Sequence, residues 1–432
     1  MTRRMRWLFI LVFISLWAFT GLAISALDRQ KKNETYKELE LFADALTFVQ
    51  TEYVDETTPK DLIYGALTGM LNALDPHSAF MTPDEYEELK VDTEGKFGGI
   101  GIEITIKDNL ITVITPIEGT PAWDAGLETN DRIVKIDDTI IKNFTLNEAV
   151  KKLRGAPGTE VQVVVWREKD GKLHSFKIKR TVIDIKDIKD SKILEDNIAY
   201  LKLVEFREGT PQDLDRALKD LKAKGMDSLI LDLRNNPGGL LDKAIEVTER
   251  FLPKGSLIVS IKGRDPKQNT EFKSNYGSPD LDTPIVLLVN EGSASGSEIV
   301  AGAFQDDKRA VLLGTTTFGK GSVQTVFPLK DGSALKLTTS RYFTPVGRSI
   351  HEKGIVPDII VEPEKIAPKK EEEKQKELEK IFEGVEEKKP ESAEKKALEQ
   401  LYASDVQLSR AVDLLKGIKM YKITSKGMAK VK

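Results

Sequence analysis

The chain has 432 residues, and its 65 lysines and arginines against 69 aspartates and glutamates give a formal net charge of −4. This near balance argues against a dedicated nucleic-acid binder, which normally carries a basic surplus, and a hydrophobic content of 40% excludes wholesale disorder. The absence of cysteine excludes disulfides and thiol nucleophiles, and three histidines leave few candidates for a histidine mechanism. At roughly 150 residues per domain, the length predicts two or three domains.

The N-terminus has the pattern of a membrane anchor. Arginines at positions 3, 4 and 6 precede an uncharged run of 21 residues from Trp7 to Leu27. As a helix this run would be about 31 Å long, which matches the hydrocarbon core of a bilayer. The alternative is a secretory signal cleaved near 23–25, but the run is long for a signal and favours an uncleaved anchor over 1–28. In either case the positive cluster predicts a bacterial cell-membrane protein whose body lies outside the cytoplasm.

Residues 29–92 are predicted to be helical. One apolar face is formed by Leu39, Phe42, Leu46 and Val49. A second helix is expected from about Lys60 to Leu74, where the sequence Asp-Pro-His-Ser at 75–78 breaks it.

Short β-type runs replace the helical pattern between 93 and 182. They are Gly101–Ile106, Leu110–Thr115, Arg132–Ile136 and Val161–Trp166, with the helix Leu146–Leu153 between them. The sequence FGGIGIE at 97–103 places three glycines before the first of these strands. Glycine lets successive N–H groups converge on an anion such as a terminal carboxylate, and the strand that follows is suited to pair with an incoming peptide. The candidate peptide-binding residues are Gly99, Ile100, Gly101 and Ile102.

A second pattern follows the glycine run. The sequence TPAWDAGL at 120–127 leads through Asn130 and Asp131 into the strand Arg132–Ile136. Together these residues resemble a PDZ domain of the bacterial protease type, spanning 93–182. The resemblance implies that this segment recognises a C-terminal tail.

From 183 to 362 strands alternate with helices, a pattern typical of an α/β layer with a buried sheet. The expected strands are Ile198–Leu203, Ser228–Leu233 and Ile285–Val289, and the expected helices are Pro211–Lys224, Leu240–Phe251 and Ser297–Asp306. Three closing strands are expected at Ala310–Gly314, Ser322–Pro328 and Ala334–Thr339. Beyond Pro363, Lys and Glu dominate, which predicts a solvated helix or linker over 363–396. An amphipathic helix, Asp405–Leu415, is expected within 397–432.

Ser295 lies at a predicted strand-to-helix turn, where its oxygen would be exposed at the positive end of a helix. The spacing Ser295-Gly-Ser-Glu298 is also that of a capping box, and this block alone favours a helix cap, because caps are far more common than nucleophiles. A serine hydroxyl needs a base, and a neutral lysine can serve as one. The candidate is Lys320, whose pKa must fall by roughly three units to work near pH 7.5, which burial in a dry cleft can supply.

The surroundings of Lys320 also fit the first seven positions of a phosphate-binding loop, GTTTFGK at 314–320. The next residue is Gly321, which has no hydroxyl for Mg²⁺, and the segment from Ser322 alternates like a strand rather than opening a helix. An extracytoplasmic location also removes the nucleotide supply, so an NTPase is rejected.

Two further groups complete a hydrolase site. Gln324 follows Lys320 by four positions and, if both belong to one strand, projects to the same face and is able to orient the amine. An oxyanion hole is expected from the backbone N–H of Gly296 and one N–H of the turn Gly238-Gly239.

The strings LDLRNNPGGLL, NEGSASGSEIVAGAFQDD, GTTTFGKGSVQ and KGIVPDI resemble the C-terminal processing peptidases, or tail-specific proteases. The resemblance covers roughly 36–362 and resumes at 405–408. It implies a Ser/Lys dyad assisted by glutamine, which cuts proteins near their C-termini after a PDZ domain engages the tail. Carried over by position, Ser295 is the nucleophile, 25 residues before the general base Lys320, and Gln324 is the helper.

One residue departs from the family pattern. Gly296 stands where the family more often has alanine, and its added backbone freedom puts the tightness of the oxyanion hole in doubt. No catalytic role is carried over to His77, which is expected to make structural hydrogen bonds in its turn.

The predicted fold class is α/β, in an α+β multidomain arrangement: membrane helix, helical segment, PDZ-like β-rich domain before an α/β serine-peptidase core, and charged C-terminal extension. The expected partners are protein substrates bound through their tails, the membrane, and a second copy through the segments Tyr36–Leu74 and Asp405–Leu415, but no nucleic acid. No cofactor is expected, and no metal, because no cluster has ligand spacing. Two alternatives stay open: a non-catalytic tail-binding scaffold, and a serine hydrolase with His351 as base.

Overall fold

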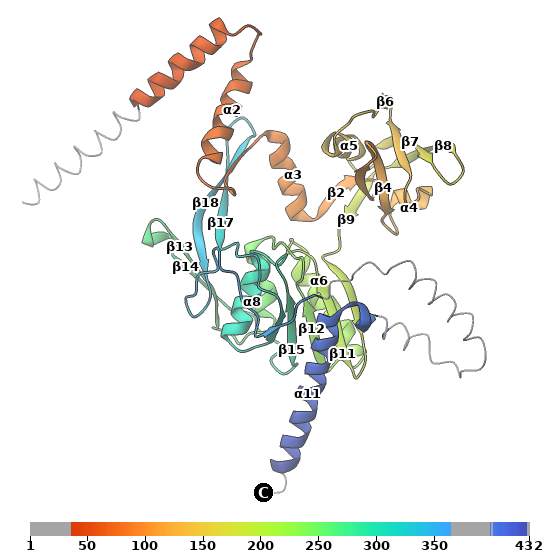
Figure 1. The fold of residues 1–432 in the computed structure, drawn as a ribbon, viewed down its shortest axis with the longest axis vertical. Coiled ribbons are helices and arrows are strands. Elements are labelled where there is room, and N and C mark those ends of the chain that lie inside the picture. Colours follow the sequence, from red (N-terminus) through yellow and green to blue (C-terminus); the bar gives the residue numbers. More distant parts are fainter. Residues whose placement is uncertain (1–35, 364–397, 399–400, 430–432) are drawn as a thin grey trace, which may run out of the picture. The chain divides into compact units, whose positions relative to one another are not determined.

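The computed structural model describes residues 36–363, 398 and 401–429 (Figure 1). The predicted membrane helix and nearly all of the predicted linker lie outside these residues. Within the described ranges, every helix is too short or too polar to cross a lipid bilayer. The chain divides into two units, one formed by residues up to Thr82 with Phe327–Leu337, the other by Pro83–Val326 with the segment from Thr338 onward.

The first unit contains a helix over 36–52, helix α2 (Pro59–Asn72) and strand β1 (Ala79–Met81). Helix α2 begins where it does because the Thr58 side chain accepts the backbone N–H of Asp61 at 3.1 Å, with a proline at the first helical position. The sequence predicted only helices over 29–92, and β1 shows that this was wrong for Ala79–Met81. The strand forms because Ala79–Met81 pair with Ala334–Lys336, a partner too distant in sequence to leave a local pattern.

The residues 75–78 form a turn after α2, where the sequence predicted that the helix breaks. The carboxylate of Asp75 accepts the backbone N–H groups of His77 and Ser78, each at 2.8 Å. His77 therefore makes a structural hydrogen bond, as predicted.

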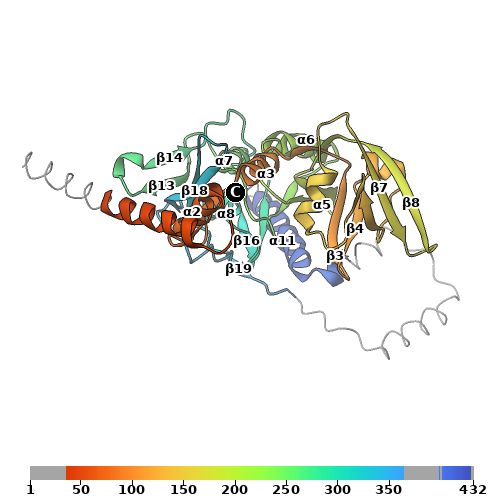
Figure 2. The ribbon, with the colours of Figure 1, turned by 90° about the horizontal axis from the view of Figure 1, so that it is seen from above.

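The second unit opens with α3 (Pro83–Glu94) and continues into a β-rich module. Its elements are β2 (Lys96–Gly99), β3 (Ile102–Lys107), β4 (Leu110–Pro116), α4 (Pro121–Ala125), β5 (Arg132–Ile136), β6 (Thr139–Ile140), α5 (Leu146–Leu153), β7 (Glu160–Arg167), β8 (Lys172–Lys179) and β9 (Thr181–Asp184). The main sheet has the order β3-β4-β5-β7-β8, and β2 pairs separately with β9. Figure 2 shows α5 beside β3, where it covers the apolar face of the sheet.

The rest of the second unit is built on a largely parallel sheet of order β10-β11-β12-β15-β16-β19. These strands are Ile188–Ile193, Ile198–Leu203, Ser228–Asp232, Ile285–Val289, Val311–Gly314 and Ile359–Ile360. Every residue of β12 and β15 is buried, which explains the apolar run Leu229–Leu231 in β12 and the wholly apolar sequence of β15. The predicted bounds of β11 and β15 are confirmed, whereas β10 and β19 were not predicted.

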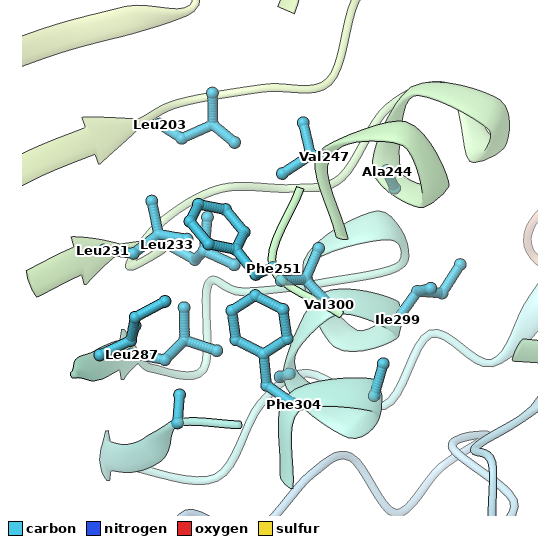
Figure 3. Close-up of a cluster of buried hydrophobic side chains, with 14 of the residues drawn as sticks. Leu203, Leu231, Leu233, Ala244, Val247, Phe251, Leu287, Ile299, Val300 and Phe304 are labelled. Atoms are coloured by element: carbon cyan, nitrogen blue, oxygen red, sulfur yellow. The ribbon is translucent and has the colours of Figure 1, made fainter. Parts of the chain in front are cut away.

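Helices cover both faces of this sheet. One face packs against α6 (Thr210–Ala223), α7 (Leu241–Glu249) and α8 (Gly296–Asp306). Figure 3 shows the rings of Phe251 and Phe304 between the strands and the helices α7 and α8. The other face packs against α11 (Val406–Ala429) through Leu408, Val412 and Leu415. The predicted amphipathic helix from 405 to 415 is therefore the start of a longer one.

A second sheet contains β13 (Leu257–Gly263), β14 (Thr270–Lys273), β17 (Ser322–Pro328) and β18 (Ala334–Phe343). The predicted bounds of β17 are confirmed. Strand β18 continues beyond its predicted end to Phe343, because Ser340–Phe343 pair with Ser260–Gly263. The sequence did not predict β13 or β14.

Candidate active site

Ser295 lies directly before α8, at the turn that leaves the carboxyl end of the parallel strand β15. Its φ of 52° and ψ of −110° are in the region that L-residues rarely adopt. A strained non-glycine residue between a strand and a helix is typical of a nucleophile whose oxygen must project from the turn. Ser295 is also the N-cap of α8, so the capping-box interpretation and the exposed-oxygen interpretation describe the same residue.

The hydroxyls of the two neighbouring serines already donate hydrogen bonds to backbone carbonyls. Ser293 and Ser297 are fully buried, and their hydroxyls donate to the carbonyl oxygens of Leu233 at 2.8 Å and Asn236 at 2.9 Å. Ser295 is only half-buried. Of the three serines in this block, Ser295 is the one placed to meet a substrate.

Lys320 lies in the loop between β16 and β17 and is half-buried. One carboxylate oxygen, Oε2 of Glu298, accepts the backbone N–H of Ser295 at 2.9 Å and that of Lys320 at 2.8 Å. The backbones of the predicted nucleophile and base therefore lie within two hydrogen-bond lengths of each other.

Glu298 has two more partners. Its Oε1 accepts the hydroxyl of Thr317 at 2.5 Å and the backbone N–H of Gly319 at 2.7 Å, and its side chain is fully buried. Burial raises the pKa of the Glu298 carboxyl above its ordinary value, and the hydrogen bonds act in the opposite direction. The sequence identified Glu298 only as a capping residue, because its other partners are 19 to 22 positions away.

Tyr342 is a second residue that sequence reasoning missed. Its side chain is buried next to that of Ser295, and its backbone N–H donates to the carbonyl of Gly321 at 2.7 Å. Burial raises the pKa of Tyr342 to about 12, against a smaller opposite effect of Ser295. The phenol therefore stays protonated at neutral pH. Its position depends on the unpredicted end of β18.

The turn 236–239 lies against Ser295. A Cβ atom on Gly238, whose φ is +105°, would lie 2.8 Å from both the Gly296 nitrogen and the Ser295 Cβ, so only glycine fits. The N–H of Gly238 already donates to Oδ1 of Asn236 at 2.9 Å. This corrects the expectation that Gly238 is an equal candidate for the oxyanion hole, because its donor is used within the turn.

The other two expected donors are differently placed. The carbonyl of Gly238 accepts the N–H of Phe206 at 2.8 Å, and across a trans peptide the N–H of Gly239 points the opposite way. Among the hydrogen bonds of the described residues, none is donated by the backbone N–H of Gly239 or Gly296. These two groups remain available to a developing oxyanion.

The expectation for Gln324 is only partly met. Strand β17 begins at Ser322, so Lys320 lies outside it, and the condition for a shared strand face, that both residues belong to one strand, is not met. The chain turns instead, with Gly321 N–H donating to Gly319 O at 3.1 Å. The Gln324 amide donates to the hydroxyls of Ser322 at 2.9 Å and Thr338 at 3.3 Å.

Steric crowding explains why position 321 is a glycine, and the same crowding argues against a phosphate-binding loop. A Cβ at this position would lie 2.2 Å from the backbone nitrogen of His351, so a serine or threonine does not fit. The segment after it is the strand β17, as the sequence predicted, and not a helix. His351 thus lies beside the Lys320 loop, and its Nδ1 is buried without a hydrogen-bond partner among the described residues.

The predicted peptide-binding residues line one hollow of the β-rich module. Gly99, Ile100, Gly101 and Ile102 lie there with Phe97, Ile104, Val150, Leu153 and Arg154. Strand β3 is at the end of its sheet, so its outer edge is open to an incoming strand among the described elements.

One cation at this hollow was not predicted. The guanidinium carbon of Arg154 lies 4.4 Å from the centre of the Phe97 ring, and Nη2 lies 3.9 Å from a carboxylate oxygen of Asp92. Stacking on an aromatic ring holds the guanidinium in the lining of the hollow, where it can pair with an anionic group.

Ser295 has a strained backbone at a strand–helix turn, and one carboxylate accepts hydrogen bonds from both Ser295 and the loop that carries Lys320. The β-rich module has an open strand edge. These features together define a serine peptidase with a PDZ domain. Family models agree: Peptidase family S41 matches residues 197–361, a PDZ domain matches 112–167, and the activating protease CtpB N-terminal domain matches 21–85. The chain belongs to the S41 family and is a carboxy-terminal processing serine protease.

Two sequence relatives support this assignment. The chain is 43% identical to the carboxy-terminal-processing protease of Bartonella bacilliformis, over 91% of each chain. It is 35% identical to the carboxy-terminal processing protease CtpA of Bacillus subtilis, over 73% of this chain and 67% of that one. Among solved structures, a photosystem II D1 C-terminal processing protease is 32% identical, with a TM-score of 0.46 over 75% of this chain and 87% of that one.

Proposed function

We propose that Ser295 and Lys320 form a catalytic dyad that cleaves extracytoplasmic proteins near their C-termini. The observation that carries this proposal is the shared acceptor Oε2 of Glu298, which brings the backbones of Ser295 and Lys320 together. The strain at Ser295 and the engagement of Ser293 and Ser297 elsewhere support the choice of nucleophile.

The proposed reaction follows from these positions. The neutral amine of Lys320 takes the hydroxyl proton of Ser295 while the Oγ of Ser295 attacks the scissile carbonyl. The resulting ammonium of Lys320 gives that proton to the leaving amine. The N–H groups of Gly296 and Gly239 stabilise the oxyanion, a contribution typically of about 3 kcal/mol per donor. Water, deprotonated by Lys320, then releases the acyl group from Ser295.

Gln324 is proposed to act indirectly. Its amide holds the start of β17 through Ser322, two residues beyond Lys320. In this role Gln324 stabilises the end of the loop that carries Lys320, where the loop joins β17.

Substrate selection is assigned to the PDZ domain. The tail adds a strand to the open edge of β3, and its terminal carboxylate is received by the N–H groups of the glycine run, with Arg154 in the lining of the hollow. The N-terminal pattern of arginines and apolar residues supports an anchor that holds this enzyme on the outer side of a bacterial cell membrane.

Substrates that differ only in their last few residues test this function. Wild-type enzyme is expected to cleave those with an accepted tail near the C-terminus, as read by mass spectrometry of the products, and Ser295→Ala is expected to bind them without cleavage. Cleavage by Ser295→Ala would exclude Ser295 as the nucleophile. Full activity on substrates with amidated tails would exclude recognition of the terminal carboxylate.

A further inference from the structure

Glu298 makes more hydrogen bonds than helix capping requires. Of the two reciprocal bonds of a capping box, only the one from the Ser295 N–H uses the Glu298 side chain. The remaining three donors are Thr317, Gly319 and Lys320, all from the loop that carries the proposed base. The carboxylate thus joins two segments that are separate in the sequence, and it does so at both members of the dyad.

We infer that Glu298 is a positioning residue, which fixes the distance between the Ser295 hydroxyl and the Lys320 amine, and this inference rests on the proposed dyad. Glu298 touches neither the substrate nor the reacting atoms. It acts through the backbone nitrogens of the two residues that do.

The acceptor capacity of the carboxylate is matched to its surroundings. An ionised carboxylate has about four lone-pair sites and no donor, and here four donors reach its two oxygens. A glutamine has the same shape but only one acceptor oxygen, and its NH2 group would face N–H donors. Because Glu298 is fully buried, water cannot replace the lost bonds.

The same contacts maintain the strain at Ser295. A residue in an unfavourable backbone conformation persists only where its surroundings hold it. Ser295 is held by the Glu298 carboxylate on one side and, on the other, by the Ala294 N–H bond to Asn236 O at 3.0 Å. Loss of the carboxylate therefore allows the turn to relax and the hydroxyl to move away from the amine.

Four variants test the inference: Glu298→Gln, Thr317→Val, Thr317→Ser and the matched control Glu291→Gln. Glu291 is an exposed carboxylate that accepts a threonine hydroxyl, that of Thr315, at 2.9 Å, but it has no bond to either dyad residue. The readouts are kcat and KM on a tailed peptide, the labelling rate of Ser295 by a small fluorophosphonate, and the melting temperature.

We expect Glu298→Gln to lower kcat and the labelling rate by about 100-fold, the typical cost of a misplacement near 1 Å, with KM within about two-fold of wild type. Glu291→Gln should match wild type. Thr317→Val, which removes one of the four donors, should lower kcat by about ten-fold, and Thr317→Ser, which keeps the hydroxyl, should restore it.

The outcomes separate this inference from the proposed function. Wild-type kcat in Glu298→Gln, or a rise in KM alone, overturns the positioning role while Ser295→Ala and Lys320→Ala stay inactive. If Glu298→Gln fails to fold, the Thr317 pair decides, and wild-type kcat in Thr317→Val overturns the inference. Activity in Lys320→Ala would instead overturn the dyad itself.

Discussion

The proposed catalytic site and the proposed tail-binding hollow are built in different ways. The catalytic site combines segments around 206, 238, 295, 320 and 342, and buried polar side chains such as Glu298 and Asn236 fasten these segments to one another. The hollow is made mainly by one continuous stretch, 97–104, with α5 beside it. Catalytic geometry thus depends on long-range hydrogen bonds, whereas recognition depends on local backbone conformation and an open strand edge.

Acidification should give the largest difference between the two regions, because it should lower kcat strongly and leave tail affinity nearly unchanged. The proposed mechanism requires a neutral Lys320, so kcat should fall about ten-fold for each pH unit below its pKa. The carboxyl of Glu298 has a raised pKa and takes up a proton at a higher pH than an ordinary glutamate, so the fall should steepen in mildly acidic solution as its acceptors are lost. Between pH 8 and pH 5 the loss should reach about 1000-fold.

Tail binding by the hollow provides the control for this experiment. The affinity of Ser295→Ala for a tail peptide, measured by calorimetry over the same pH range, should change little. A kcat that is highest in acid would contradict a lysine base.

The oxyanion turn gives the next largest effect. Gly238→Ala places a Cβ 2.8 Å from the Gly296 nitrogen at a φ of +105°, so it should displace the turn and lower kcat by about 100-fold. Tail affinity should be unchanged. Gly158→Ala is a suitable control, since Gly158 also has positive φ but has no atom near its added Cβ; equal losses in both variants would show that backbone strain alone is responsible.

Removal of Arg154 should affect recognition and not chemistry. We expect Arg154→Ala to raise KM for a tailed peptide by about ten-fold at unchanged kcat, because one charge-assisted contact is lost. A peptide with an amidated end should show no such difference between the two enzymes. A fall in kcat without a change in KM would place Arg154 outside the tail site.

Loss of the Tyr342 hydroxyl should have the smallest effect. Its phenol lies against the Ser295 side chain, and Tyr342→Phe should lower kcat by about five-fold, as expected for one neutral hydrogen bond. Initial rates at saturating substrate measure this directly. An unchanged kcat would show that the phenol only packs against the serine.

Elements whose sequence pattern is local were predicted well. The bounds of β5, β11, β15, β17 and α5 agree with the predicted ranges, because apolar alternation, buried runs and a capping box are properties of neighbouring residues. Strands β1, β10, β13 and β14 were missed. Strand β1 forms through its distant partner Ala334–Lys336, and β13 pairs with the distant segment Ser340–Phe343 as well as with β14. The sequences of β10 and β14 are mixed in polarity, so they lack a clear apolar pattern.

The candidate site shows the same limit. The positions of Ser295 and Lys320 follow from motifs, but the joint role of Glu298 depends on a loop 19 to 22 residues further along. The sequence also gave no way to rank Gly238 and Gly239, since the Gly238 N–H is occupied by a side chain within its own turn. For Gln324, even spacing implied a shared strand face, whereas β17 starts only at Ser322.

The dyad is tested most directly by comparing Lys320→Ala with His351→Ala, because His351 lies beside Gly321 in the loop that carries Lys320. Cleavage of a tailed substrate should fall by roughly 1000-fold or more in Lys320→Ala and stay near wild type in His351→Ala, with both variants folded by their melting temperatures. Retained cleavage in Lys320→Ala, with loss confined to His351→Ala, would contradict the account.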